Sequence, residues 1–310
     1  MIRDALKTFV VVNPNSSGGK TGKGWEPLKE AIHQQVGRFE FGFTQFSGHG
    51  ATLAAEAVAK GFEMVVSLGG DGTHNEVANG LLQGGSPDKV VLAIVTSGTG
   101  GDFRRTLGLG KGPLPAIRCL SGRSTRTLDV GRFTYVDHGG AKAVWHFINI
   151  LSFGIGGLVD HIVNTSGKAL GGKATFFLAT LRALAKFKPA EISLSVDDGS
   201  ARVVTIHNVA IANGKYFGGG MLVAPDAAPD DGQFDVVSFE GMSTLSFAGL
   251  GSSIYAGKHV TNRHVTVTRA RRVVATSKDR VLLDVDGEPK GMLPLTVDLM
   301  PGALRVKVAS

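Results

Sequence analysis

Residues 63–82, EMVVSLGGDGTHNEVANGLL, decide the fold because they join a strand to a helix through a glycine-rich turn. The apolar residues Met64 to Leu68 predict a short buried strand. The glycines of the turn, residues 69–73, let the backbone bend sharply and let phosphate oxygens approach its N–H groups. Apolar residues then follow at helical spacing, at Val77, Ala78, Leu81 and Leu82. The N-terminus of this predicted helix favours anions.

Asp71 is the unusual residue of this turn. A carboxylate beside a phosphate site repels the phosphate unless a cation lies between them. Asp71 therefore indicates either Mg²⁺ or a hydrogen bond to an incoming hydroxyl. The alternative is an ordinary strand-to-helix turn, in which Asp71 and Thr73 cap the helix.

Strands and helices alternate in the first part of the chain. Strands are predicted at 8–12, 39–44, 64–68 and 89–95, and helices at 25–36 and 51–60. This alternation predicts a parallel sheet with helices on its faces, in an α/β domain of residues 1–130.

Two further polar loops follow strands of this predicted sheet, NPNSSGGK at 13–20 and TSGTGGDF at 96–103. Ligands of open α/β sheets bind at the carboxyl ends of the strands, so we expect all three loops at one site. Arg104 and Arg105 come directly after the last loop and could face phosphate. We expect at least one of them on the surface instead.

The pattern changes near residue 128, after which apolar and polar residues alternate and helices become scarce. Alternating stretches occur at 203–212, 234–239, 264–267, 281–285, 295–299 and 304–308. We predict a second domain, residues 131–310, of mostly antiparallel β structure, with its last strand or strands able to return to the first domain. Helices are expected at 157–164 and at 174–187, where an apolar, basic helix more often caps a sheet than lies on a membrane.

Two acidic clusters lie in the second domain. DAAPDDGQFD at 226–235 could hold a divalent cation, and its alternative is a polar hairpin turn. In DVDGE at 284–288, the residues Asp284, Asp286 and Glu288 share one face if the strand continues that far. Such carboxylates can serve as a general base, and the alternative is again a hairpin turn.

Composition limits the partners of the protein. The formal net charge of +7 over 310 residues suits an anionic partner such as a nucleotide or an anionic membrane surface. We expect no nucleic acid, because the basic residues are scattered. Cys119 is the single cysteine and fits a reducing, cytoplasmic compartment. No apolar stretch has spanning length, so we expect membrane contact to be peripheral. A homodimer is left open.

Several motifs occur in order along the chain: Asn13-Pro14 with its polar loop, GGDGTHNE at 69–76, GTGGDF at 98–103, Asp129-Val130-Gly131, Asn213-Gly214, Asp230-Asp231-Gly232 and Asp286-Gly287-Glu288. With them the chain resembles a bacterial member of the diacylglycerol kinase catalytic superfamily, which includes lipid kinases similar to sphingosine and ceramide kinases. The resemblance implies an α/β domain like those of NAD kinases and phosphofructokinases, a C-terminal β-sandwich, and a nucleotide cleft between them.

The resemblance also implies an ATP- and Mg²⁺-dependent lipid kinase, which transfers the γ-phosphoryl group to a diacylglycerol-like or sphingoid hydroxyl. Asp286 is implied as the proton acceptor, with Glu288 in support and Asp71 in the catalytic set. Asp102 and Asp129 match acidic positions near the acceptor. The implied Mg²⁺ is held by Asp231 and by backbone oxygens of Ala228 and Gln233. The implied ATP-binding residues are Asn13, Pro14, Asn15, Thr44, Gly69, Gly70, Asp71, Gly72, Thr73, His74, Asn75 and Thr99.

One position departs from the pattern of the family, because Gly101 stands where an asparagine is usual. Loss of that amide removes hydrogen bonds near the acceptor or within the loop. Two alternatives therefore remain: a kinase of a non-lipid acceptor such as NAD, and a nucleotide-binding regulator without turnover.

Overall fold

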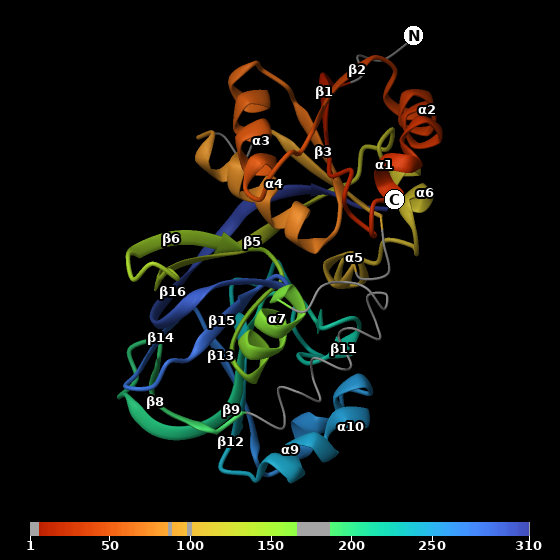
Figure 1. Ribbon diagram of the computed structural model, residues 1–310. Coiled ribbons are helices and arrows are strands. Elements are labelled where there is room, and N and C mark those ends of the chain that lie inside the picture. Colours follow the sequence, from red (N-terminus) through yellow and green to blue (C-terminus); the bar gives the residue numbers. More distant parts are fainter. Residues whose placement is uncertain (1–5, 86–88, 98–100, 166–186, 310) are drawn as a thin grey trace. The chain divides into compact units, whose positions relative to one another are not determined.

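The computed structural model describes residues 6–85, 89–97, 101–165 and 187–309. The chain forms two compact units, residues 1–128 with 302–310 and residues 129–301 (Figure 1). The helix predicted at 174–187 lies outside the described residues, apart from Phe187.

The first unit contains a parallel sheet in the order β4-β3-β1-β2, with the end of β16 beside β4. Its strands are β1 (Thr8–Val12), β2 (Phe39–Phe43), β3 (Met64–Gly69), β4 (Val91–Thr96) and the end of β16 (Glu288–Lys307). Every residue of β1, β3 and β4 is buried, as expected for parallel strands covered on both faces. The predicted α/β fold is confirmed.

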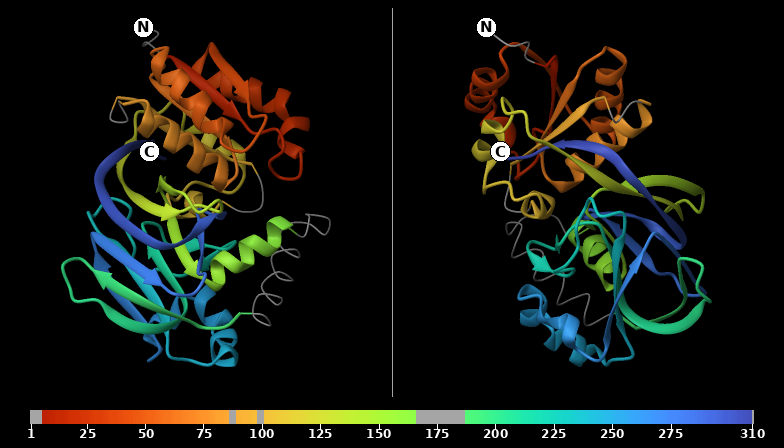
Figure 2. Two further views of the ribbon diagram at one scale, coloured as in Figure 1. Left: turned by 60° about the vertical axis from the view of Figure 1, so that its left-hand side comes forward. Right: turned by 180° about the vertical axis from the view of Figure 1, so that it is seen from behind.

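Helices cover both faces of this sheet (Figure 2). They are α1 (Lys20–Lys23), α2 (Trp25–Val36), α3 (His49–Ala59), α4 (Asp71–Gln83), α5 (Asp102–Thr106) and α6 (Pro113–Arg118). α3 packs against α4 on one face, and α2 packs against α6 on the other. Most of the apolar stripe predicted on α4 is buried, since Val77, Ala78 and Leu81 are fully enclosed, whereas Leu82 is only partly buried.

The second unit is built mainly from antiparallel strands. They are β5 (Thr125–Val136), which begins in the first unit, β6 (Lys142–Phe147), β7 (Ile150–Gly154), β8 (Ala190–Val196), β9 (Arg202–Ala212), β10 (Tyr216–Phe217), β11 (Met221–Leu222), β12 (Phe234–Glu240), β13 (Val265–Ala270), β14 (Arg272–Ser277) and β15 (Leu282–Val285). The helical segments are α7 (Ile155–Thr165), α9 (Thr244–Gly249), α10 (Gly251–Tyr255) and the 3₁₀ helix η1 (Lys258–Thr261). Among the described residues, no helix has the length and apolarity needed to span a bilayer.

The strand pairings of this unit close a circuit, β16-β14-β8-β9-β7-β15 and back to β16. Alternate residues of these strands point inward and form one apolar core, which includes Phe153, Leu194, Ile206, Val273, Leu283 and Val297. The predicted antiparallel β architecture of this unit is therefore confirmed.

The last strand differs from its prediction. Residues 295–299 and 304–308 were expected as separate strands, whereas β16 is continuous over Glu288–Lys307. Pro301 and Gly302 lie between the two predicted stretches, but the strand continues past them, and Leu304 and Val306 beyond them are buried. β16 thus begins in the second unit and ends in the first, where Arg305 lies opposite Val91 and Val306 opposite Leu92.

Candidate active site

The loops after β1 and β3 are tied together by one hydrogen bond. Asn13 Nδ2 donates to Thr73 Oγ1 at 2.9 Å, and Asn13 Oδ1 accepts from the Asn15 N–H at 3.0 Å. Gly69 must be glycine because a Cβ there would lie 2.5 Å from Thr73 Oγ1. The structure therefore brings together the first loop and the GGDGT turn.

The loop after β4 joins the same network. Thr21 Oγ1 donates to Ser97 Oγ at 2.6 Å, and the Ser97 N–H donates to the Gly69 carbonyl at 2.9 Å. Thr44, at the end of β2, donates its N–H to the Val12 carbonyl at 2.8 Å. The carboxyl ends of the parallel strands thus form one connected edge, as predicted. Thr99 lies outside the described residues.

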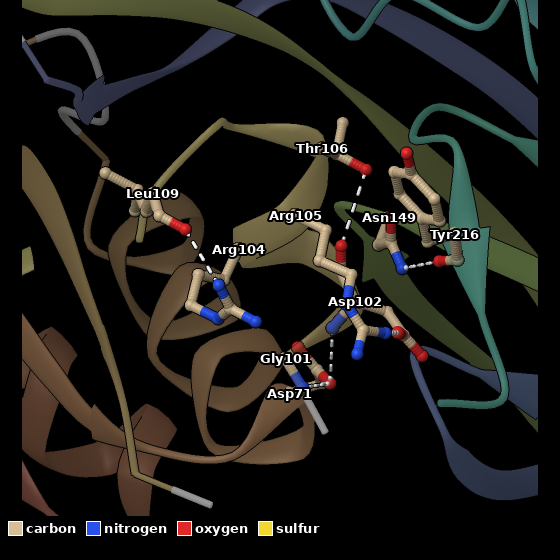
Figure 3. Close-up of polar contacts among 9 residues, drawn as sticks. All are labelled: Asp71, Gly101, Asp102, Arg104, Arg105, Thr106, Leu109, Asn149 and Tyr216. Atoms are coloured by element: carbon tan, nitrogen blue, oxygen red, sulfur yellow. Dashed lines mark hydrogen bonds and ion pairs between the residues drawn. The ribbon is translucent and has the colours of Figure 1, made fainter. Parts of the chain in front are cut away.

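Asp71 organises the start of α5 (Figure 3). Its Oδ2 accepts hydrogen bonds from the N–H groups of Gly101, at 2.9 Å, and Asp102, at 3.2 Å. Its Oδ1 is buried and has no hydrogen-bond partner among the described residues. Burial raises the pKa of Asp71, and the backbone hydrogen bonds oppose that rise. The orphaned oxygen fits either option drawn from the sequence, a cation or an incoming donor.

Gly101, Arg104 and Arg105 surround this contact. Gly101 has φ +83°, and a Cβ there would lie 2.8 Å from Thr96 Cγ2 and 3.0 Å from Arg104 Nε. Arg104 is buried and donates through Nη1 to the Leu109 carbonyl at 2.8 Å. Arg105 Nη1 lies 2.6 Å from Asp102 Oδ1 in an ion pair, and the Arg105 side chain is 30% exposed (Figure 3). Arg104 therefore does not lie on the surface, and Arg105 lies there only in part.

His74 and Asn75 point into the interior of the first unit. His74 Nδ1 lies 2.8 Å from Ser67 Oγ, and its Nε2 lies 3.2 Å from Thr96 Oγ1. Burial lowers the pKa of His74 to about 3, so the ring is neutral near pH 7. Asn75 accepts from Asn79 Nδ2 through its carbonyl at 3.0 Å. The His74 side chain therefore holds α4 on the sheet, and the assignment of His74 and Asn75 to ATP binding stays a prediction.

Glu76 is a positioning residue that the sequence analysis missed. Its Oε1 accepts from the Gly48 N–H at 2.7 Å, and its Oε2 accepts from the Gly50 N–H at 3.0 Å. These amides lie at the N-terminus of α3, whose unsatisfied donors and dipole favour a carboxylate. Glu76 thereby ties α4 to the segment that follows Thr44. The only available signal was its place in the GGDGTHNE motif.

Asp286 lies in a tight hairpin between β15 and β16. Val285 pairs with Glu288, and the two turn residues have φ +51° and +86°, as a two-residue hairpin with this twist requires. The Asp286 carboxylate accepts three backbone N–H groups, from Ile148, Asn149 and Ile150, at 3.0, 3.0 and 2.9 Å. Those donors stabilise the charged carboxylate and fix its position.

The carboxylates of this segment do not share a face. The hairpin interrupts the alternation on which that expectation depended, because the strand ends at Val285. Asp284 accepts from Ser152 Oγ at 3.3 Å and from the Gly287 N–H at 2.9 Å. Glu288 is exposed at the start of β16. The hairpin alternative was therefore correct for the local structure, and Asp286 alone receives the three amides.

Asp129 clamps the turn that carries the DDG motif. Its N–H donates to the Pro229 carbonyl at 2.7 Å, and its Oδ2 accepts from the Gly232 N–H at 2.7 Å. Asn213 Nδ2 donates to the carbonyls of Asp129 and Ile148, at 2.9 and 2.8 Å. One amide therefore links the strand that carries Asp129 to the segment that binds Asp286.

The residues predicted to hold a metal, Ala228, Asp231 and Gln233, are a poor fit for one. Asp231 Oδ2 is ion-paired with Arg269 Nη2, and Asp231 Oδ1 accepts from the Gln233 N–H at 3.2 Å. The single carboxylate of the set is thus already engaged through both oxygens. In the described part of the chain, no group of three or more His, Cys, Asp or Glu side chains is arranged for a metal.

Comparison with known proteins identifies the class to which this fold and these loops belong. Residues 7–133 match the diacylglycerol kinase catalytic domain, and residues 149–308 match the YegS C-terminal NAD kinase beta sandwich-like domain. The chain therefore belongs to the diacylglycerol kinase and YegS family of lipid kinases. The resemblance drawn from the motifs is confirmed, and membership of this kinase family implies the use of ATP.

Individual relatives support this placement. A diacylglycerol kinase of Bacillus subtilis is 27% identical over 92% of this chain and 90% of that protein. A diacylglycerol kinase of Mycobacterium tuberculosis is 30% identical over 82% of this chain and 79% of that protein. The fold is similar to the crystal structure of a diacylglycerol kinase from Bacillus anthracis, with a TM-score of 0.72, 20% identity, and 98% and 97% of the two chains covered.

Proposed function

We propose that this chain is an ATP- and Mg²⁺-dependent lipid kinase, which transfers the γ-phosphoryl group of ATP to the hydroxyl of a diacylglycerol-like or sphingoid lipid. The observation that carries the proposal is the Asp286 carboxylate, which three backbone N–H groups hold in place. The chain that carries this carboxylate belongs to a family of lipid kinases. The related diacylglycerol kinases support the acceptor class.

The nucleotide is assigned to the loops at the carboxyl edge of the first unit. Backbone N–H groups of the GGDGT turn and the start of α4 are donors suited to phosphate oxygens. The bond from Asn13 to Thr73 keeps the first loop beside that turn. Phosphoryl transfer depends mainly on positioning and electrostatics, which a connected set of loops supplies. Mg²⁺ that accompanies ATP would neutralise charge on the γ-phosphoryl group.

Asp286 is assigned to the acceptor hydroxyl. Because the three amides hold its carboxylate in a fixed position, Asp286 acts chiefly by orienting the hydroxyl through a hydrogen bond. The hydroxyl proton passes to the carboxylate as the new O–P bond forms and ADP leaves. We assign Asp71 the role of holding the nucleotide loops in position, because it accepts hydrogen bonds from the N–H groups of Gly101 and Asp102 at the start of α5.

The lipid acceptor implies a membrane surface as the place of reaction. The net charge of +7 favours attraction to anionic lipids, worth on the order of 1 kcal/mol for each basic residue near the surface. We therefore propose peripheral contact from the cytoplasm. The homodimer left open by the sequence stays a prediction.

The test is transfer of labelled γ-phosphate from ATP with Mg²⁺ to a panel of acceptors in mixed micelles. The panel holds diacylglycerol, monoacylglycerol, sphingosine, ceramide and NAD. Label in a lipid supports the proposal and names the acceptor. Label in NAD alone would reassign the chain to a non-lipid acceptor. Tight ATP binding without label in any acceptor would favour the regulator without turnover.

A further inference from the structure

The turn with the DDG motif is held by arginine side chains. Arg269 Nη2 is ion-paired with Asp231 Oδ2, and Arg269 Nε lies 3.4 Å from Asp235 Oδ1. Arg271 Nε donates to the Gly232 carbonyl at 3.1 Å. One guanidinium therefore spans two carboxylates of the turn, and a second binds its backbone.

The sheet places Arg269 there. β12 pairs with β13 so that Asp235 lies directly opposite Arg269, and such cross-strand neighbours have side chains within contact distance. Asp235 is only 3% exposed, so the cation beside it compensates a carboxylate removed from water. The Arg269 side chain is 42% exposed, and it is long enough to reach Asp231 as well.

The other groups of the turn also have protein partners. Asp129 binds the Pro229 carbonyl and the Gly232 N–H, each at 2.7 Å. The second oxygen of Asp231 accepts from the Gln233 N–H. Mg²⁺ needs a nearly octahedral set of oxygens, and a guanidinium bound to the same carboxylates repels a divalent cation placed beside them.

We propose that Arg269 takes the place of a metal ion at the DDG turn of this chain, so that the turn is stable without Mg²⁺. The guanidinium supplies a fixed positive charge and directional donors where a metal would supply a charge and coordination bonds. The proposal concerns this turn alone and does not depend on which acceptor the enzyme uses.

The test is thermal unfolding of the full chain without nucleotide, in EDTA and in excess Mg²⁺. The wild-type Tm should be the same in both solutions. Arg269→Gln should lower the Tm in EDTA by at least about 3 °C, and Mg²⁺ should restore part of the loss because Asp231 and Asp235 are freed to bind it. Arg272→Gln is the matched control, since Arg272 pairs at 2.7 Å with Asp298 and not with the turn.

A second readout follows metal binding directly, with Mn²⁺ as a probe for Mg²⁺. Mn²⁺ titration monitored by electron paramagnetic resonance should detect one additional Mn²⁺ site in Arg269→Gln, which binds more tightly than any site of the wild type. Arg269→Lys keeps the charge and should lack that site, which also keeps the test decisive if Arg269→Gln folds poorly. A wild-type Tm that falls in EDTA and returns with Mg²⁺, or equal effects of Arg269→Gln and Arg272→Gln, would overturn the proposal.

Discussion

His74 is a buried histidine that should make the stability of the protein depend on pH. Burial lowers its pKa from 6.5 to about 3, so the unfolded chain binds a proton between these values that the folded chain does not. The free energy of unfolding should therefore fall as the pH drops from 7 to 5, by about 2 kcal/mol from this residue. Urea unfolding of the wild type and His74→Gln at both pH values measures it.

The control is His138→Gln, because His138 is exposed. His74→Gln should remove the part of the pH-dependent loss that His74 contributes, whereas His146, whose pKa is also lowered, to about 4, keeps its own contribution. His138→Gln should leave the loss in place. Equal pH dependence in the wild type and His74→Gln would show that the ring is not the buried, neutral group described here.

Gly101 should tolerate substitution poorly although an asparagine is usual at this position in the family. Its φ of +83° strains any L side chain, and a Cβ would lie 2.8 Å from Thr96 Cγ2. Gly101→Ala should cost about 2–3 kcal/mol of unfolding free energy. Gly108 has φ +68°, and a Cβ there would meet nothing within 4 Å, so Gly108→Ala should cost only about 1 kcal/mol.

Urea unfolding measures both glycine variants. Removal of the Thr96 methyl in Gly101→Ala/Thr96→Ser should recover part of the extra cost, because that methyl is the closest atom to the new Cβ. Equal costs at Gly101 and Gly108 would mean that the crowding around Gly101 has no energetic effect.

At the scale of elements, Glu76 joins α4 to α3 through the N–H groups of Gly48 and Gly50. Glu76→Ala should lower the free energy of unfolding by about 1–2 kcal/mol, since it removes a helix cap. It should also raise KM for ATP more than it lowers kcat, because the segment after Thr44 loses its anchor. Steady-state kinetics at varied ATP measure that split.

Two further variants separate capping from charge in this prediction. Glu76→Gln keeps an oxygen acceptor and should retain most of the wild-type KM. Glu56→Ala removes an exposed carboxylate of α3, 3.9 Å from Lys60, and should change little. A KM for ATP unchanged in Glu76→Ala would contradict the positioning role.

Several elements could be predicted from the sequence because one physical signal dominated each. The run Thr8 to Val12 is apolar and fully buried, and its predicted bounds match β1. The apolar spacing from Trp25 to Val36 likewise matches α2. β8 and β14 were missed. AEISLSV alternates apolar and polar residues as a half-buried strand does, so β8 could have been predicted, whereas RVVATS does not alternate regularly and its identity as a strand depends on its partners.

Only those parts of the site could be predicted whose position follows from the order of strands and loops along the sequence. The glycine loops follow strands in sequence, so their common edge could be expected from strand order. The backbone amides that bind Asp286 belong to Ile148, Asn149 and Ile150, which lie far from Asp286 in the sequence. No local sequence pattern predicts such a contact. The pairing of Arg269 with Asp231 was missed for the same reason.

At the scale of the whole molecule, the first unit requires the end of the chain. Residues 302–310 belong to it, and β16 pairs there with β4. Val306 is fully buried, so Val306→Ser should lower the free energy of unfolding by about 2–3 kcal/mol. Val203→Ser is the control, because Val203 is 67% exposed. Urea unfolding should distinguish them, and equal effects would contradict the role of β16 in this unit.

We propose that the chain phosphorylates a lipid hydroxyl positioned by Asp286. The most direct measurement is kcat for γ-phosphate transfer to the lipid acceptor in the wild type and Asp286→Asn, with the Kd for ATP and the Tm measured beside it. We predict that kcat falls by about 10²–10⁴-fold while the Kd for ATP stays near the wild-type value and the protein remains folded. Near-normal turnover in Asp286→Asn would contradict the account.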